Sequence, residues 1–278
     1  MVKGLGQGAY GKVVCIQSKR SKKKYALKVI AKNLIEKLRM VDQLKNEVTI
    51  MNKLQHPNIV KLITHFEDSK NIYCVLELAL EGHLYSRVRK VGKYDEQKAA
   101  SILYDIFKAV NYMHEQDPPI IHRDIKPENI LFFSTGVKLA DFGWSNIHDK
   151  VRNTFCGTPD YLAPEMILER GHDHKLDVWT LGILMYELIV GRAPFSVPKG
   201  IKNPQMKNRI LERNIMTAKV KFPPFVSKHA KDLIGACLNK RPDYRPSCRE
   251  ALCFPWFKQF GFLYDPPGKS QNFVIFYE

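Results

Sequence analysis

The amino-acid sequence predicts an α+β protein with two lobes: a small antiparallel β-sheet lobe containing one main helix, and a larger, mainly helical lobe. Two observations predict this architecture. Residues 1–77 hold short segments rich in β-branched residues around one stretch of helical periodicity, whereas residues 84–260 hold several apolar stripes at helical spacing. With 278 residues, 45% of them hydrophobic, the chain is long enough to bury a sizeable core.

Strands are expected first along the chain. Gly4–Val14 has the pattern of a strand, a turn and a second strand. Lys24–Ile30 alternates in a way that places Ala26 and Lys28 on the same side of a strand.

One helix is expected in this lobe, over Val41–Leu54. Its apolar positions Leu44, Met51 and Leu54 recur at helical spacing, and Glu47 lies on the same face. A carboxylate on a buried face needs a partner. Lys28 is the candidate partner, and the alternative is a surface lysine beside a solvated glutamate.

The larger lobe should begin with a long helix over Asp95–Gln116, with Asp95 as its N-cap. Later helices are expected at Lys175–Val190, ended by Gly191, and around His229–Leu238. The apolar stripe of the first helix consists of Ala99, Ile102, Leu103, Ile106, Phe107, Val110 and Met113.

Composition excludes several classes of protein. The longest apolar run, Leu181–Val190, is broken by Glu187 and is far shorter than a membrane-spanning helix. Six scattered cysteines without a C-x-x-C pair indicate neither a zinc cluster nor a disulfide framework, so we expect an intracellular protein. The net charge of +16 does not by itself identify a nucleic-acid ligand. The basic run Lys19–Lys24 is expected as a solvated hairpin, with nucleic-acid binding or a nuclear signal as alternatives.

A glycine-rich segment stands near the start of the chain. Gly6, Gly8 and Gly11 match G-x-G-x-x-G, in which backbone N–H groups can approach phosphate oxygens. A dinucleotide-binding site would continue into a helix, but Lys12–Ile16 has the pattern of a strand. The segment therefore favours a phosphate-binding turn between two strands.

Three further motifs follow in a fixed order: His122–Asn129, Asp141–Gly143 and Ala163–Glu165. Together with the glycine-rich segment, they make the chain resemble a eukaryotic protein kinase from Gly4 to about Phe257. The resemblance implies a bilobal protein-kinase fold, with a single kinase domain over 1–278. Its expected parts are an N-lobe at 1–77, a hinge at 78–83, a C-lobe at 84–260 and a C-terminal tail at 261–278.

The kinase resemblance implies a role for each polar residue of these motifs. Asp141 and Asn129 would hold Mg²⁺, Lys28 would contact the α- and β-phosphates of ATP, and Asp124 would accept or orient the substrate hydroxyl proton. Lys126 would neutralise the transferred phosphate. In similar kinases this lysine, with a Gly-Thr pair such as residues 157–158, accompanies Ser/Thr specificity, so we expect a Ser/Thr kinase.

Longer strings resemble the Aurora kinases in particular. They lie at 141–145, where Trp144 follows the metal-binding triplet, at 155–166 and at 172–179. The last two strings also resemble related basophilic kinases, which stay as the alternative family. The Aurora resemblance implies a role in cell division.

The same resemblance implies the binding residues. Glu77 and Ala79 would contact adenine through their backbone, and Glu128 and Glu187 would bind a substrate Arg two residues before the target hydroxyl. A spine between the lobes would comprise Met51, Leu62, His122 and Phe142, and Glu165 would pair structurally with Arg245. The remaining nucleotide-binding residues would be Leu5, Val13, Ala26 and Leu131, with Leu76 as gatekeeper.

Regulation is expected at Thr154, which fits the activation-loop phosphosite of Auroras. Phosphate there could order the loop against Arg123. Auroras carry a second arginine just before the helix glutamate, and this chain has Asn46 at that position. Between Phe195 and Phe222 the chain is longer than the Aurora pattern by about eight residues, which indicates a surface loop insertion.

The resemblance also implies partners and location. We expect protein substrates, an activating scaffold or spindle partner on the N-lobe, a monomeric catalytic domain, and no membrane or direct nucleic-acid binding. The cytoplasm or nucleus is expected, at the spindle, centrosome or chromosomes. A non-catalytic kinase-fold scaffold would lack Lys28, Asp124, Asn129 or Asp141, and all four are present. The other alternative, a nucleic-acid-binding module, is supported only by the net positive charge and by no recognition motif.

Overall fold

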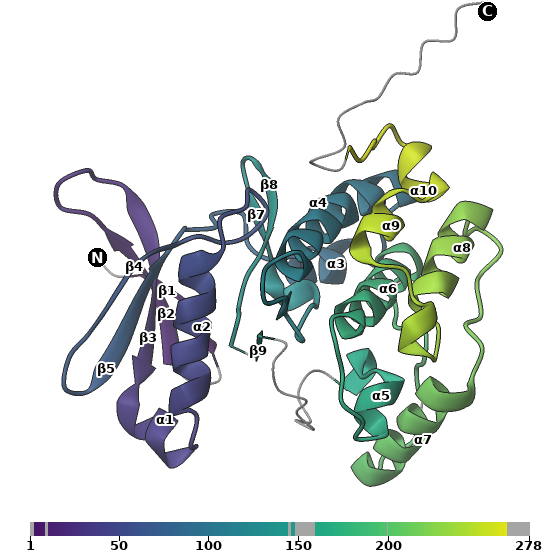
Figure 1. Ribbon diagram of the computed structural model, residues 1–278, viewed down its shortest axis with the longest axis horizontal. Coiled ribbons are helices and arrows are strands. Elements are labelled where there is room, and N and C mark those ends of the chain that lie inside the picture. Colours follow the sequence, from purple (N-terminus) through teal and green to yellow (C-terminus); the bar gives the residue numbers. More distant parts are fainter. Residues whose placement is uncertain (1–2, 9–10, 144–145, 148–158, 199, 266–278) are drawn as a thin grey trace, which may run out of the picture.

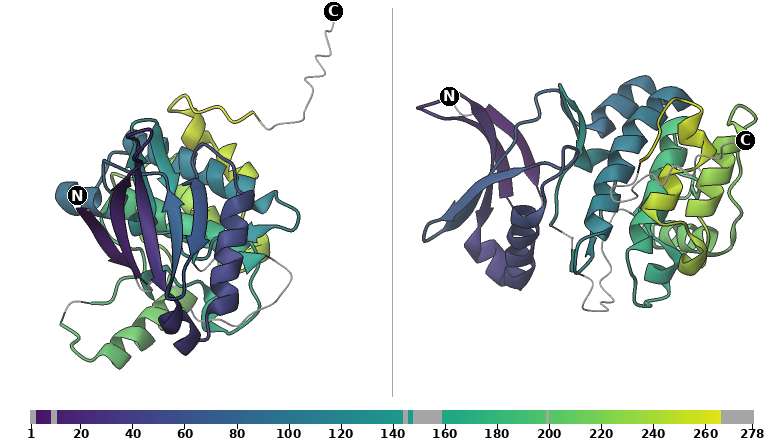
Figure 2. Two further views of the ribbon diagram at one scale, coloured as in Figure 1. Left: turned by 90° about the vertical axis from the view of Figure 1, so that its left-hand side faces the viewer. Right: turned by 45° about the horizontal axis from the view of Figure 1, so that its top comes forward.

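The two predicted lobes are present in a computed structural model, which describes residues 3–8, 11–143, 146–147, 159–198 and 200–265. A twisted sheet with one long helix against it forms one lobe, and a bundle of helices forms the other (Figure 1). The right-hand view of Figure 2 shows the sheet and the helical bundle lying side by side.

The small lobe is a five-stranded antiparallel sheet in the order β1-β2-β3-β5-β4. The segment after the glycine-rich turn continues as strand β2, as predicted, which contradicts the dinucleotide-binding alternative. Ala26 and Lys28 both lie on β3, opposite Leu76 and Cys74 of β5. The strands are β1 (Lys3–Gly8), β2 (Gly11–Gln17), β3 (Lys24–Ala31), β4 (Leu62–Glu67) and β5 (Asn71–Leu76).

Two helices accompany this sheet. The predicted one is α2 (Val41–Lys53), which buries Leu44, Ile50 and Met51. The other is α1 (Lys32–Lys37), which the sequence analysis did not predict because six residues are too few to show helical periodicity. The basic hairpin between β2 and β3 is exposed over 19–24, as expected for a solvated turn.

The large lobe is mainly helical, as predicted. Asp95 caps α4, since its side chain accepts a hydrogen bond of 2.7 Å from the backbone N–H of Lys98. Gly191 ends α6 in the left-handed conformation at φ 86°. The helices are α3 (Leu84–Val91), α4 (Glu96–His114), α5 (Pro164–Ile167), α6 (Lys175–Val190), α7 (Pro204–Thr217), α8 (Lys228–Cys237), α9 (Cys248–Leu252) and α10 (Pro255–Lys258).

Short elements connect these helices and carry several motif residues. The strands are β6 (Ile120–Ile121), β7 (Ile130–Phe133), β8 (Gly136–Leu139) and β9 (Asn146–Ile147). The single-turn helices are η1 (Pro127–Asn129), η2 (Pro159–Tyr161) and η3 (Pro242–Tyr244).

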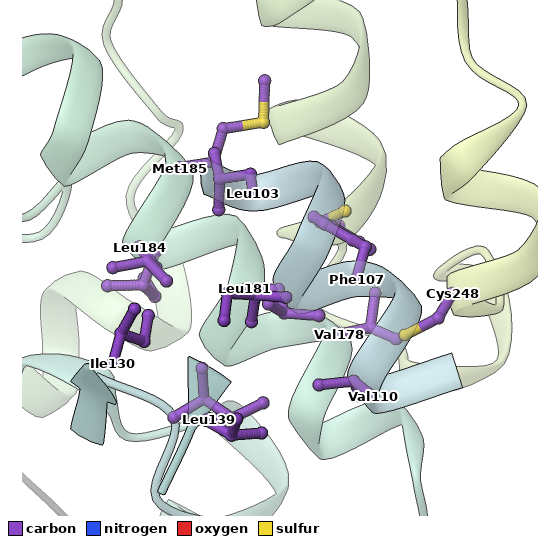
Figure 3. Close-up of a cluster of buried hydrophobic side chains, with 14 of the residues drawn as sticks. Leu103, Phe107, Val110, Ile130, Leu139, Val178, Leu181, Leu184, Met185 and Cys248 are labelled. Carbon is purple, nitrogen blue, oxygen red and sulfur yellow. The ribbon is translucent and has the colours of Figure 1, made fainter. Parts of the chain in front are cut away.

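The core of the large lobe forms around α6. Figure 3 shows side chains of α4, β7, β8 and α6 gathered in one apolar cluster, among them Phe107, Leu139 and Leu181. Between Leu176 and Ile189 every residue of α6 except Glu187 is buried. Burial of this kind stabilises a fold by about 1.5–3 kcal/mol per large apolar side chain. The polar residues of α6 are therefore held in fixed positions.

Between Phe195 and Phe222, where the sequence analysis expects a surface loop insertion, the chain forms a loop followed by α7. Asn203 caps this helix by accepting a hydrogen bond of 3.0 Å from the backbone N–H of Met206. None of the helices in the described part of the chain combines the length and the apolarity needed to cross a membrane.

Candidate active site

Three charged residues, one from β3, one from α2 and one from the segment after β8, meet at one point. Lys28 of β3 lies with its Nζ atom 2.6 Å from Glu47 Oε1 of α2 and 3.4 Å from Asp141 Oδ1. Burial alone would lower the pKa of Lys28, but the adjacent carboxylates raise it above its ordinary value. Lys28 therefore stays charged, and Glu47 has the partner that the sequence analysis expected.

Asp141 begins the segment that lies against α2. Its backbone adopts a left-handed conformation, φ 64°, which is uncommon outside glycine and concentrates at functional sites. Burial would raise the pKa of Asp141, but the charge of Lys28 and the backbone N–H of Gly143 hold it below its ordinary value. The side-chain amide of Gln43 on α2 donates to the carbonyl oxygen of Gly143. The segment is thus fixed to the same helix that carries Glu47.

Phe142 connects this segment to the core. Its side chain is fully buried, and its ring meets the His122 ring edge-on, with 5.1 Å between centroids. Met51 and Leu62 of the small lobe are also buried, and they belong to the same apolar cluster as Phe142. The four residues named as a spine are thus all buried.

Asp124 is held within its own loop. Its carboxylate accepts hydrogen bonds of 2.9 Å from Lys126 Nζ and from Asn129 Nδ2, and Asn129 Nδ2 also donates to the Asp124 carbonyl oxygen at 2.8 Å. Because the amide nitrogen of Asn129 is engaged, its amide oxygen faces away from Asp124. Asp124 is 6% exposed, so the loop orients a carboxylate with little access to bulk water.

Asp177 anchors this loop, and the sequence analysis did not single it out. Its carboxylate, fully buried at the start of α6, accepts hydrogen bonds of 2.8 Å from the backbone N–H groups of His122 and Arg123, and contacts His114 Nε2 at 2.9 Å. Burial would raise the pKa of Asp177, but the hydrogen bond and charge of His114 lower it. The sequence signals are a carboxylate in the first turn of a mainly apolar helix and its place within the string 172–179.

The expected nucleotide-binding residues lie on the strands of the small lobe and on β7. Ala26 is buried, Val13 and Leu131 are half-buried, and Leu5 is exposed. Gly6 and Gly8 lie on β1. Gly11 has no space for a side chain, since a Cβ atom there would lie 1.8 Å from the Val29 carbonyl oxygen.

Leu76 ends β5 and leads into the connection between the lobes. Glu77 donates its backbone N–H to Lys61 at 3.1 Å, and its side chain accepts from Lys138 of β8. The sequence analysis did not identify this pair. Its effect is to engage the Glu77 carboxylate with β8.

Acidic residues gather beside the loop of Asp124. Tyr161 of η2 donates its hydroxyl to Glu187, the one α6 residue of the central run that is not buried. Burial raises the pKa of Glu187, the Tyr161 hydroxyl opposes this, and the nearby carboxylates of Glu128 and Asp160 raise it further. Glu128 and Glu187 thus lie within electrostatic range of each other, and Asp160 joins them.

The pair of Glu165 and Arg245 forms as the sequence analysis expected. Arg245 Nη1 and Nη2 donate to the Glu165 carboxylate at 2.6 and 2.7 Å, and Arg245 is 1% exposed. The pair fixes α5 to the segment before α9, so its role is architectural. Thr154 and Trp144 lie outside the described residues.

The described residues contain no group of three or more His, Cys, Asp or Glu side chains suited to a metal ion. Asp141 and Asn129 instead offer two hard oxygen donors. This set fits Mg²⁺, which in phosphate-transferring sites takes one or two protein oxygens and completes its shell with phosphate oxygens and water.

Comparison with known proteins places the chain among protein kinases. The Protein kinase domain family model matches residues 1–257. Similar proteins include "Aurora kinase B-A" of Xenopus laevis, 42% identical over 257 residues, and "Aurora kinase" of Candida glabrata, 42% identical over 255 residues; each alignment covers 91% of this chain and 68% of the relative. "Aurora kinase A-B" of Xenopus laevis is 40% identical over 255 residues, or 91% of this chain and 60% of the relative.

Proposed function

The chain belongs to the protein kinase family and, within it, to the Aurora kinases, and from this membership we propose how its cleft residues transfer phosphate. As a Ser/Thr protein kinase it acts on proteins, with ATP as phosphate donor and Mg²⁺ as the usual metal of the family. The observation that supports the proposal best is the meeting of Lys28, Glu47 and Asp141 beside the hydrogen-bonded loop of Asp124.

Lys28 is proposed to bind the α- and β-phosphates of ATP. Its charged ammonium, aligned by Glu47 at 2.6 Å, is a donor of fixed position for phosphate oxygens. Gly6, Gly8 and Gly11 would admit the phosphates close to the backbone. Adenine would lie among Leu5, Val13, Ala26, Leu76 and Leu131, with hydrogen bonds to the backbone of Glu77 and Ala79.

Asp124 is proposed to accept the proton of the substrate hydroxyl. Lys126 and Asn129 hold its carboxylate in place, and Lys126 is a cation that can approach the transferred phosphate. Asp141 and Asn129 would hold Mg²⁺ through their oxygen atoms. Bound Mg²⁺ neutralises charge on the phosphate oxygens.

Glu128 and Glu187 are proposed to bind an Arg two residues before the target hydroxyl. The raised pKa of Glu187 supports this, since a partly buried carboxylate among other carboxylates gains most from a cationic ligand. We also propose regulation by phosphate at Thr154 and an activating partner on the small lobe. The proposed role is in cell division, at the spindle, centrosome or chromosomes.

The test is transfer of radiolabelled γ-phosphate from ATP and Mg²⁺ to a Ser peptide with Arg two residues upstream. Asp141→Asn should abolish transfer, whereas Asp232→Asn, a matched change on the exposed surface of α8, should not. Replacing the peptide Arg by Ala should lower kcat/KM. Mass spectrometry of the active enzyme should find phosphate on Thr154.

Three results would contradict parts of this proposal. Transfer that ignores the peptide Arg would remove the Arg-binding role of Glu128 and Glu187 and favour another basophilic group. Thr154 without phosphate in active enzyme would remove the regulatory site. No transfer after treatment with an activating kinase would favour the non-catalytic scaffold.

A further inference from the structure

Cys248 is a buried thiol that takes no part in the proposed phosphate transfer. It is the first residue of α9 and is 1% exposed. Its side chain points into the apolar cluster of the large lobe (Figure 3). A capping box fixes the start of α9, because Ser247 and Glu250 exchange hydrogen bonds of 2.7 to 3.1 Å. The thiol therefore has a defined position beside α4, against which α9 packs.

This thiol lies against the ring of His114, the last residue of α4. Cys248 Sγ is 3.8 Å from His114 Nδ1, and the other ring nitrogen, Nε2, is 2.9 Å from Asp177 Oδ2. The Asp177 carboxylate in turn accepts the backbone N–H groups of His122 and Arg123. A continuous chain of contacts thus runs from α9 to the loop of Asp124.

The direction of each hydrogen bond follows from Asp177. Although burial opposes it, contact with His114 lowers the pKa of Asp177, so its ionised carboxylate can only accept. His114 Nε2 must then carry a proton, and in a neutral imidazole Nδ1 is left with a lone pair. Burial raises the pKa of the Cys248 thiol, which keeps its proton and can donate it to that lone pair.

A buried cysteine can also serve only as a small apolar side chain. An apolar residue in place of Cys248, however, would leave Nδ1 of His114 without a donor, and the His114 side chain is only 7% exposed to water. The neighbouring ring of His174 meets His114 edge-on, with 5.2 Å between centroids. In the described part of the chain, no group other than the thiol forms a hydrogen bond with Nδ1.

We propose that Cys248 is a positioning residue for the loop of Asp124: its thiol donates to His114 Nδ1 and so keeps the Nε2–H group directed at the Asp177 carboxylate that holds the loop. The inference rests on the proposed role of Asp124 in phosphate transfer. It extends the anchor of that loop to α9, an element that contributes no residue to the proposed transfer.

The first test is spectroscopic and does not depend on activity. Two-bond ¹H–¹⁵N NMR spectra of protein labelled with ¹⁵N-histidine distinguish the two imidazole tautomers, and His114→Gln identifies the signals of His114. The wild type should show the tautomer protonated at Nε2. Cys248→Ala should move the Nδ1 resonance toward that of a free imidazole lone pair, whereas Cys248→Ser, which keeps a donor, should move it the other way.

The second test is kinetic. Cys248→Ala should lower kcat for phosphate transfer by about 2- to 5-fold, as expected for the loss of one weak hydrogen bond, and should leave KM for ATP unchanged. Cys248→Ser should restore kcat to about the wild-type value. Cys237→Ala removes another buried thiol, on α8, and should change neither kcat nor the His114 spectrum.

Several results would overturn the inference. It fails if His114 carries a proton on Nδ1, if Cys248→Ala leaves the Nδ1 resonance or kcat unchanged, or if Cys248→Ser loses as much kcat as Cys248→Ala, which would make the role one of packing. Should Cys248→Ala not fold, the wild-type spectrum and Cys248→Ser still decide. Absent transfer in the wild-type enzyme would instead be a failure of the proposed function, and the spectra alone would then decide whether Cys248 bonds His114.

Discussion

Asp177→Asn should weaken both the stability of the protein and its catalysis. Asp177 Oδ2 meets two groups, the His122 N–H and His114 Nε2, and Oδ1 accepts from the Arg123 N–H. An asparagine keeps one acceptor oxygen. In the amide orientation that keeps more contacts, the asparagine oxygen retains the two contacts of Oδ2. Its NH₂ group then faces the Arg123 N–H, and two donors cannot form a hydrogen bond.

The cost follows from these contacts. One charge-assisted hydrogen bond, worth about 1.5–3 kcal/mol, is lost, and two others weaken to the range of neutral bonds, about 1 kcal/mol less each. The free energy of unfolding should therefore fall by about 3–5 kcal/mol, and Tm by roughly 6–10 °C. Because the backbone before Asp124 would shift, kcat should fall by about 10- to 100-fold. KM for ATP should change little, since Lys28, Glu47 and Asp141 do not contact Asp177.

Thermal unfolding and steady-state phosphate transfer measure the two effects. His114→Gln removes only one of the three partners and should cost less on both measures. Asp232→Asn is the surface control. A Tm within about 1 °C of wild type together with an unchanged kcat would refute the view that Asp177 holds the catalytic loop.

Three other predictions concern stability. Arg245→Met leaves Glu165 buried without its partner and should cost about 3–5 kcal/mol in denaturant unfolding. Gly182→Ala should cost about 1–3 kcal/mol by thermal unfolding, because a Cβ atom there would lie 2.8 Å from a side chain at the end of α8. Burial, and secondarily the charge of Lys108, lowers the pKa of His56 to about 4. Neutral His56 accepts a hydrogen bond from the Asn58 N–H. Its contribution to the free energy of unfolding should be fully present above about pH 6.5 and should be lost as the pH falls toward 4. Because the side chain is partly exposed, we expect a loss of about 1–2 kcal/mol. His56→Gln should flatten that decline in urea titrations.

These predictions have distinct refutations. For Arg245→Met, a loss below about 1 kcal/mol would mean that the buried pair adds nothing over an apolar side chain. For Gly182→Ala, an unchanged Tm would mean that α6 and α8 separate easily. For His56→Gln, an unchanged decline of the unfolding free energy below pH 6.5 would mean that other groups cause the decline.

Signals that lie close together in the sequence predicted the fold well. The bounds of α6 follow from an apolar run that ends at Gly191, and the start of α4 follows from the cap at Asp95. The pairing of Lys28 with Glu47 was also predictable, because each polar residue on a buried face requires a partner.

Other parts of the site depend on tertiary packing. Asp177 contacts groups 54 to 63 residues away, and Lys138 reaches Glu77 across 61 residues. No periodicity or motif spacing encodes such pairs, because they arise only when the elements pack. The same holds for Asp160, whose carboxylate becomes part of the acidic group only through the position of η2 beside α6.

The burial of α6 has a consequence for the substrates that the enzyme can use. Asp177, which holds the catalytic loop, and Glu187, which faces the proposed Arg, stand at opposite ends of one helix, about 15 Å apart at 1.5 Å per residue. Under the proposed function, this distance would set the spacing between the reacting hydroxyl and the bound Arg. Because the helix cannot lengthen without disrupting the core around it, the interior of the lobe would then fix the spacing of the recognised sequence. Differences in specificity would have to arise in outer loops, which can vary without altering that length.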